Sequence, residues 1–223
     1  MGRLLYCVGR AAFRGLFAAA GGLEWVHEER VPESGPLIVA PNHLSFADPP
    51  AVGSATHRPL CFMAKKQLFV PVVGRVLRMV GAFPVDRGSA DLAAIRKAQS
   101  LLRAGEAVLV FPEGTRGDGK SLGEPNQGVA LLAKLTSAPV IPVAVVGSDR
   151  FLPRGAKLPR RAKISVVWGE PFTYASVAEG LEEKEARRRF ALTLMERIRD
   201  LAAERGLVLH IPWAIARPSA VEQ

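Results

Sequence analysis

The stretch Leu37–Asp48 reads LIVAPNHLSFAD and places an apolar run directly before a polar cluster. Leu37–Ala40 has the length and composition of a buried strand, and Phe46–Ala55 has a helical pattern. In open α/β sheets, binding and catalytic sites form in loops outside the carboxyl ends of the strands, so His43 lies where chemistry is expected. This stretch therefore predicts a strand, a functional loop and a helix in succession.

Outward from this stretch, strand-like runs alternate with helical patterns in both directions along the 223 residues. The alternation predicts an α/β fold, a single domain with a largely parallel mixed sheet flanked by helices. The expected strands are Leu37–Ala40, Leu60–Ala64, Ala82–Val85, Ala107–Phe111, Val140–Val146 and Lys163–Trp168. The expected helices are Phe46–Ala55, Val72–Val80, Ala90–Ala104, Gln127–Ser137 and Val177–Arg205.

The composition indicates a folded protein with an anionic partner. Hydrophobic residues make up 48% of the chain, and its formal net charge is +9. Nucleic acid, an anionic membrane surface and a phosphorylated or CoA-like substrate would all complement this charge. No nucleic-acid-binding motif or interleaving of aromatic and basic residues accompanies it, so no nucleic acid partner is expected. The two cysteines, Cys7 and Cys61, have no spacing typical of a metal site or a disulfide framework.

The first 20 residues form a helical pattern that contains no acidic residue. Arg3, Arg10 and Arg14 fall in one stripe of this helix, beside a separate apolar face. That face contains Leu4, Leu5, Val8, Ala11, Ala12 and Leu16. Such a pattern is typical of a helix in the membrane interface, so residues 1–22 are expected to be an amphipathic membrane-associating helix whose arginines meet anionic head groups. The alternative is a helix that packs on its own domain.

His43 and Asp48 are five residues apart across the expected strand-to-helix turn. Such a turn can fold the carboxylate back onto the imidazole, so that Asp48 accepts from one ring nitrogen and leaves the other as a base. On spacing alone, Asp48 could equally cap the helix near an unrelated histidine. Ser45 suggests a hydrolase nucleophile, but the G-x-S-x-G elbow of such enzymes does not occur in the chain.

Three further segments place chemistry at the ends of expected strands. Phe111–Arg116 reads FPEGTR and sets an arginine beside a glycine turn, and Gly81–Arg87 reads GAFPVDR and supplies a second arginine. Val140–Val145 reads VIPVAV, an apolar strand interrupted by a proline. Two arginines at strand ends can bind a phosphate bidentately, and glycine lets backbone N–H groups approach it. The sequence thus offers a base, an orienting acid and an anion clamp.

The chain resembles the glycerolipid acyltransferase family, in its 1-acyl-glycerol-3-phosphate (lysophosphatidic acid) branch. The four blocks of that family are matched, in this order, by N-H-x4-D, G-x4-D-R, F-P-E-G-T-R and V-I-P-V-A-V. The segment Ala64–Phe69 resembles the lysine-bearing stretch between the first and second blocks. The resemblance implies that His43 is the general base and Asp48 its partner. It also implies a strand around Pro142 that shapes the acyl or acceptor pocket. The implied substrate phosphate site consists of Arg87, Glu113, Gly114, Thr115, Arg116 and Lys65.

The same resemblance implies an acyltransferase domain over residues 23–206 and a C-terminal tail over 207–223. The expected reaction moves a fatty acyl group from an acyl-CoA or acyl carrier protein thioester to the free hydroxyl of a lysophospholipid. The favoured acceptor is 1-acyl-glycerol-3-phosphate, which would give phosphatidate. The alternatives are another lysophospholipid or glycerol-3-phosphate as acceptor, or a non-catalytic lipid-phosphate-binding protein of the same fold.

No stretch approaches the 18 or so apolar residues of a spanning helix. Attachment to a membrane surface is therefore expected to be peripheral or monotopic, on the cytoplasmic face of the cell membrane. No cofactor or metal is expected, because a thioester is already a reactive acyl donor.

Overall fold

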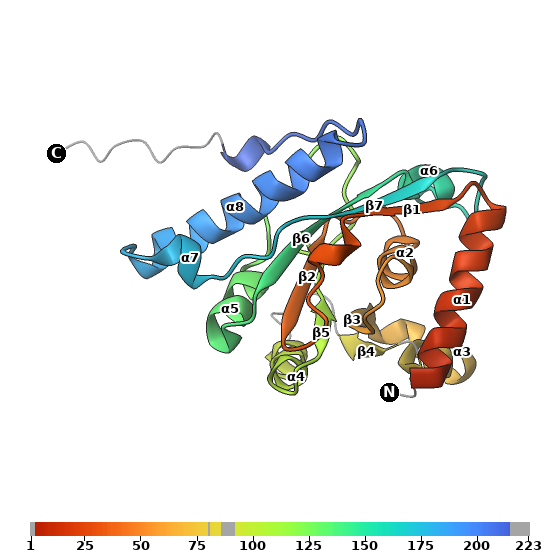
Figure 1. The fold of residues 1–223 in the computed structure, drawn as a ribbon, viewed down its shortest axis with the longest axis horizontal. Coiled ribbons are helices and arrows are strands. Elements are labelled where there is room, and N and C mark those ends of the chain that lie inside the picture. Colours follow the sequence, from red (N-terminus) through yellow and green to blue (C-terminus); the bar gives the residue numbers. More distant parts are fainter. Residues whose placement is uncertain (1–2, 80, 86–91, 215–223) are drawn as a thin grey trace.

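The computed structural model describes residues 3–79, 81–85 and 92–214 (Figure 1). Within them the strands form one seven-stranded sheet in the spatial order β1-β7-β6-β2-β5-β3-β4. The strands are β1 (Leu23–Val26), β2 (Leu37–Pro41), β3 (Leu60–Lys65), β4 (Ala82–Val85), β5 (Ala107–Leu109), β6 (Val140–Val146) and β7 (Ile164–Trp168). The α-helices are α1 (Arg3–Ala19), α2 (Asp48–Ser54), α3 (Pro71–Met79), α4 (Leu92–Arg103), α5 (Gln127–Thr136), α6 (Ser148–Phe151), α7 (Ala175–Ala178) and α8 (Glu183–Ala203). Short 3-10 helices lie at η1 (Glu28–Arg30), η2 (Lys66–Leu68) and η3 (Pro212–Ala214).

The sheet is mixed and largely parallel, as expected. Strands β2 to β6 run parallel to one another, β7 runs antiparallel to β6, and β1 pairs in parallel with β7. The six expected strands all form, with ends shifted by at most two residues. The sequence patterns do not predict β1, because the strand has only four residues and Glu24 interrupts its apolar run.

The expected helices also form, but the last of them is divided in two, and part of the segment after it is packed rather than a tail. The last expected helix divides into α7 and α8, because Gly180 adopts a left-handed φ of 73° between them. The assignment of residues 207–223 to a tail is wrong for its described part. Leu209 and Ile211 are buried, and His210 N donates to Lys120 O at 2.9 Å, so residues 207–214 belong to the packed domain.

Helices cover both faces of the sheet. On β6, Ile141 and Val143 face the cluster under α1 and α2, whereas Val140 and Ala144 face the cluster under α4, α5 and α8 (Figure 1). Because both faces are buried, the central strands are continuous apolar runs rather than alternating ones. The two faces therefore have different neighbours, and the side of a strand residue decides which helices it meets.

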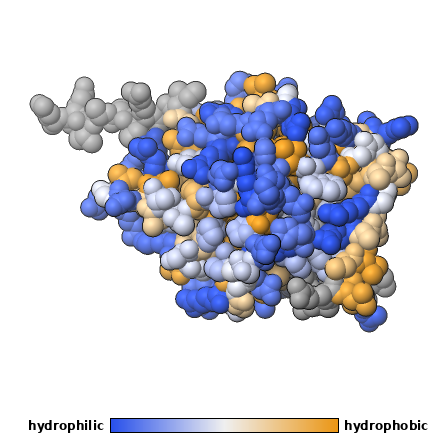
Figure 2. Space-filling view, viewed as in Figure 1, coloured by the Kyte–Doolittle hydropathy of each residue, from blue (hydrophilic) through white to orange (hydrophobic). Residues whose placement is uncertain are grey.

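Helix α1 packs on the domain along one side and exposes an apolar side. Tyr6 and Phe17 are buried, while Arg10 donates to Thr56 O at 2.9 Å and Arg14 to Ser54 O at 2.7 Å. The guanidinium groups of Arg10 and Arg14 thus bind carbonyls at the end of α2, and the side chain of Arg3 lies outside the description. The expectation that these arginines meet head groups stays a prediction. The exposed large apolar residues of α1 are Leu4, Leu5, Val8 and Leu16. In Figure 2, apolar colours run along the right edge, where Figure 1 places α1.

No helix in the described part of the chain is long and apolar enough to cross a membrane.

Candidate active site

The loop that carries His43, residues 42–47, is held at its start by the amide of Asn42. Asn42 Nδ2 donates to Val145 O at 3.0 Å, and Val145 N donates to Asn42 Oδ1 at 2.7 Å. The side chain is fully buried and joins residues 103 positions apart. A buried amide with both polar groups satisfied has one favoured orientation. Asn42 therefore fixes the start of the His43 loop against β6.

The loop brings His43 and Asp48 together, as their spacing predicts. His43 Nδ1 lies 2.8 Å from Asp48 Oδ2, and the two residues are 3% and 0% exposed. The same oxygen accepts from Leu44 N at 2.7 Å and from Ser45 N at 2.8 Å. An ionised carboxylate only accepts hydrogen bonds, so we assign the ring proton to Nδ1. The other ring nitrogen, Nε2, then keeps its lone pair for proton transfer.

The neighbours of this pair exclude a serine nucleophile and shield the imidazole. Ser45 Oγ donates to Leu152 O at 2.7 Å and accepts from Ala47 N, so it holds backbone rather than pairing with the histidine. Phe111 stacks on His43 with ring centroids 3.9 Å apart and planes at 23°. The stacked ring restricts the orientation of the imidazole and gives it an apolar wall.

Glu113 binds two loops, and its assignment to the phosphate site is wrong. Its Oε1 accepts from His43 N at 3.1 Å, and its Oε2 accepts from Gly123 N at 3.0 Å. Gly117 N donates to His43 O at 2.7 Å, so both backbone polar groups of His43 are held from the segment after β5. Burial raises the pKa of Glu113, partly opposed by these N–H donors. A carboxylate so engaged would repel a phosphate, and its role is to position the His43 loop.

Of the remaining predicted phosphate ligands, Arg116 reaches the His43 site. Its guanidinium lies over the Phe46 ring, 3.9 Å from the centroid, and both residues line the same cavity as His43. Gly114 takes a left-handed φ of 66° in the turn after β5, and it and Thr115 are exposed outside the cavity lining. They shape the turn that presents Arg116.

The other two predicted phosphate ligands are not placed as side chains. Lys65 ends β3, at the sheet edge where β2 and β5 also end, and only its backbone is described. Arg87 lies outside the described residues. Their part in the phosphate site stays a prediction.

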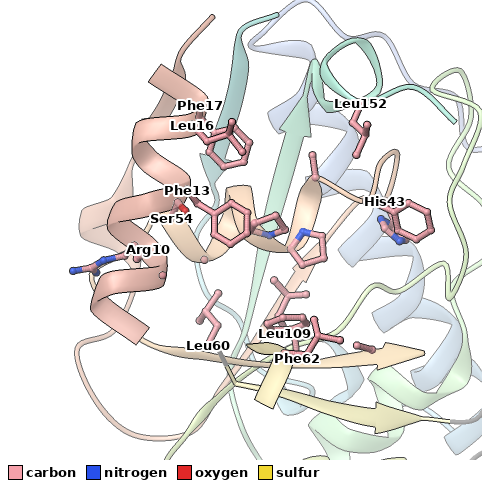
Figure 3. A pocket seen from close by; sticks show the side chains of 18 of the residues that line it. Arg10, Phe13, Leu16, Phe17, His43, Ser54, Leu60, Phe62, Leu109 and Leu152 are labelled. Atoms are coloured by element: carbon pink, nitrogen blue, oxygen red, sulfur yellow. The ribbon is translucent and has the colours of Figure 1, made fainter. Parts of the chain in front are cut away.

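The cavity beside His43 has a volume of about 550 Å³ and lies between α1 and the sheet. Phe13 and Leu16 reach it from α1, and Leu60 and Leu109 from β3 and β5 (Figure 3). Its lining is mainly aliphatic and aromatic, which suits a hydrocarbon chain that ends at the imidazole. The expectation that the strand around Pro142 shapes the acyl pocket is wrong for this cavity, because no residue of β6 lines it. Pro142 itself faces Gly169 on the side covered by α8.

The sequence relationships of the chain agree with this geometry. A family model described as Acyltransferase matches residues 23–146. The chain belongs to the acyltransferase family. A 1-acyl-sn-glycerol-3-phosphate acyltransferase of Bacillus subtilis is 30% identical over 85% of this chain and 93% of the relative. The enzyme of that name from Streptococcus pneumoniae is 29% identical over 75% of this chain and 63% of its own.

A solved structure extends the likeness to three dimensions. The 1-acyl-sn-glycerophosphate acyltransferase of Thermotoga maritima superimposes with a TM-score of 0.71 at 26% sequence identity. The match covers 97% of this chain and 80% of that one. The single α/β domain of this acyltransferase is thus shared over nearly its whole length, including α1.

The role of Glu113 in this acyltransferase gives a testable prediction. Glu113→Gln should lower kcat about tenfold or more while leaving the acceptor KM nearly unchanged. Glutamine keeps one acceptor oxygen but sets an NH2 group against a backbone N–H, so one loop loses its contact. Steady-state kinetics with acceptor titration would measure this. An unchanged kcat with a raised acceptor KM would return Glu113 to the phosphate site.

The raised pKa of Glu113 adds a pH dependence to the same variant. The Glu113 carboxyl binds its proton more tightly in the folded protein than in the unfolded chain. Wild-type stability therefore falls as pH rises from the pKa of Glu113 in the unfolded chain through its raised pKa in the folded protein. Glutamine does not titrate. The free energy of unfolding of Glu113→Gln relative to wild type should therefore rise across that pH window, as denaturant titrations at several pH values would measure.

Proposed function

We propose that this acyltransferase moves a fatty acyl group from a thioester donor to the free hydroxyl of 1-acyl-glycerol-3-phosphate, giving phosphatidate. The observation that carries the proposal is the His43–Asp48 pair at one end of an apolar cavity that Arg116 also lines. The relatives named for this reaction support the choice of acceptor. A base, an acyl site and a cation for the acceptor phosphate are the parts that this reaction needs.

The chemistry follows from the free Nε2 of His43. This nitrogen takes the acceptor hydroxyl proton as the oxygen attacks the thioester carbonyl, and a tetrahedral intermediate forms. Asp48 stabilises the imidazolium while it lasts. The intermediate collapses with cleavage of the carbon–sulfur bond, and the imidazolium returns its proton to the leaving thiolate. General-base assistance of this kind contributes about 10²–10⁴-fold to the rate.

Substrate placement divides between the cavity and Arg116. The apolar wall would hold an acyl chain with its carbonyl carbon near His43, since Leu109 and Phe62 line the floor there (Figure 3). Arg116 would bind the acceptor phosphate, and the stacked Phe46 ring holds the guanidinium in place. Fixing the hydroxyl through a remote phosphate lowers the barrier by saving orientational entropy.

We place the reaction at a membrane surface on its cytoplasmic side. The acceptor keeps its acyl chain in a bilayer, and α1 exposes apolar side chains beside the cavity that its other side chains line. Both candidate donors, acyl-CoA and acyl carrier protein thioesters, are made inside the cell. The proposed attachment is peripheral or monotopic.

The test is thiol release over a panel of lysophospholipids, each assayed with acyl-CoA and with acyl carrier protein thioester. The proposal expects the highest kcat/KM for lysophosphatidate, because its phosphate monoester offers the most charge to Arg116. A higher kcat/KM with a lysophospholipid that carries a zwitterionic head group would contradict the proposed acceptor. The two donor series identify the physiological thioester.

Arg116→Ala is expected to weaken acceptor binding by roughly 1.5–3 kcal/mol, the value of a charge-assisted hydrogen bond to phosphate. The acceptor KM should then rise about 10–150-fold, while the donor KM stays within about twofold of wild type. Arg116→Lys is the matched control, because it keeps the charge but loses the bidentate geometry, and it should fall in between. A raised donor KM with an unchanged acceptor KM would reverse the assignment.

A further inference from the structure

A strongly basic loop joins α6 to β7 and has no role in the proposed chemistry. The basic loop, residues 154–161, contains Arg154, Lys157, Arg160 and Arg161 and no acidic residue. All four are exposed, and none of them makes an ion pair with another residue in the described part of the chain. Leu158 lies among them and is 77% exposed.

The basic loop is anchored at both ends to functional parts of the molecule. At its start, Leu152 O accepts from Ser45 Oγ of the His43 loop at 2.7 Å. At its end, Ala162 N donates to Ala20 O, just after α1, at 2.8 Å. Gly21 makes this approach possible, since a Cβ there would lie 2.6 Å from the carbonyl carbon of Ala162. The loop thus bridges the catalytic pair and the C-terminal end of α1.

The described exposed face of α1 is apolar, because the two arginines described on this helix turn their guanidinium groups to the domain. Its large exposed residues are Leu4, Leu5, Val8 and Leu16, while Arg10 and Arg14 donate to carbonyls of the domain. Lasting adsorption to a bilayer combines apolar insertion with attraction to anionic lipids. The basic loop supplies exposed cations next to α1, and Leu158 adds an apolar side chain among them.

We propose that the basic loop and the exposed face of α1 form one docking surface for an anionic lipid bilayer. The inference rests on the proposed function only in that the acceptor is a bilayer lipid. Lys157 and Pro159 of the loop line the same cavity as Leu16 of α1. A bilayer on this surface therefore brings its lipid chains beside the wall of the acyl cavity.

The competing interpretation is that these cations bind the phosphate groups of the thioester donor. The exposed Leu158 and the adjoining apolar face of α1 favour the bilayer, because a soluble phosphate would not need apolar partners. The two interpretations differ in which quantity responds to neutralising the loop: vesicle affinity or the donor KM.

The test uses the triple variant Arg154→Gln, Arg160→Gln, Arg161→Gln in the full chain. Its matched control is the same change to glutamine at three exposed arginines of α4 and α8, which cover the other face of the sheet from α1: Arg96, Arg103 and Arg189. Binding is measured by co-sedimentation with phosphatidylglycerol–phosphatidylcholine vesicles at low salt. We expect the loop variant to lose on the order of a hundredfold in vesicle affinity and the control less than about threefold. Thiol release with a short-chain, water-soluble lysophosphatidate should stay at the wild-type rate in both.

A second pair of variants separates charge from apolar area. Two variants should weaken binding to pure phosphatidylcholine vesicles as well: Leu158→Asp, and the triple change of Leu4, Leu5 and Val8 to glutamine. The proposal would be overturned if the two arginine triples lost vesicle affinity equally. It would also be overturned if the loop variant bound vesicles like wild type but had a raised donor KM. If wild type released no thiol with the soluble acceptor, that result would count against the proposed function. Vesicle binding does not depend on catalysis, so it would still test the docking surface.

Discussion

His43→Ala is expected to lower the rate of acyl transfer by about 10²–10⁴-fold, the contribution of general-base catalysis. The imidazole is the group whose Nε2 is free to take the hydroxyl proton, since Nδ1 is held by Asp48. The fold should survive, because Asp48 keeps its bonds to Leu44 N and Ser45 N. Thiol release and thermal unfolding, measured on the same preparation, separate loss of catalysis from loss of structure.

His57→Ala is the control for this variant. His57 is an exposed histidine that contacts Glu28 at 3.1 Å and lies outside the cavity lining. Its removal should leave the rate within about twofold of wild type, as for most surface changes. If His43→Ala retained more than about a tenth of the wild-type rate, the general-base role would be wrong.

Asp48→Ala should lose nearly as much activity as His43→Ala, on the order of 10²–10⁴-fold. A single carboxylate oxygen holds the imidazole and two backbone N–H groups, so alanine releases the ring and loosens the His43 loop together. The expected loss therefore appears in kcat, and the free energy of unfolding should also fall as buried donors lose their acceptor.

Asp48→Asn tests which property of the carboxylate matters. Because all three donors meet the same oxygen, an asparagine oxygen in that place can keep the Nδ1 proton and the loop. What asparagine lacks is the negative charge that stabilises the imidazolium. Its loss in kcat should be clearly smaller than that of Asp48→Ala, with stability closer to wild type. Equal losses in the two variants would mean that the charge alone carries the effect.

Local patterns in the sequence were enough to predict most of the fold and the catalytic pair. The apolar run before Asn42 and the five-residue spacing of His43 and Asp48 are contained in one strand–turn–helix segment, and the structure follows them. Strand β1 gives no such pattern, because it has only four residues and Glu24 interrupts them.

Contacts between distant segments are what the sequence could not predict. The bridge from Asn42 to Val145 and the contact of Glu113 with the His43 backbone depend on which strands are neighbours. Pro142 was misplaced because both faces of β6 are apolar, so its pattern does not show which face meets the cavity. The helical wheel likewise groups Arg10 and Arg14 but cannot show that the carbonyls at the end of α2 lie opposite them.

The proposed reaction requires that His43 activates a lipid hydroxyl rather than water. The direct measurement is the ratio of phosphatidate formed to thiol released when wild-type protein, lysophosphatidate and an acyl thioester are combined. We expect one phosphatidate per thiol, no thiol release above background without the acceptor, and loss of both products in His43→Ala. Thiol released without lysophosphatidate, together with free fatty acid, would contradict it by showing a thioester hydrolase.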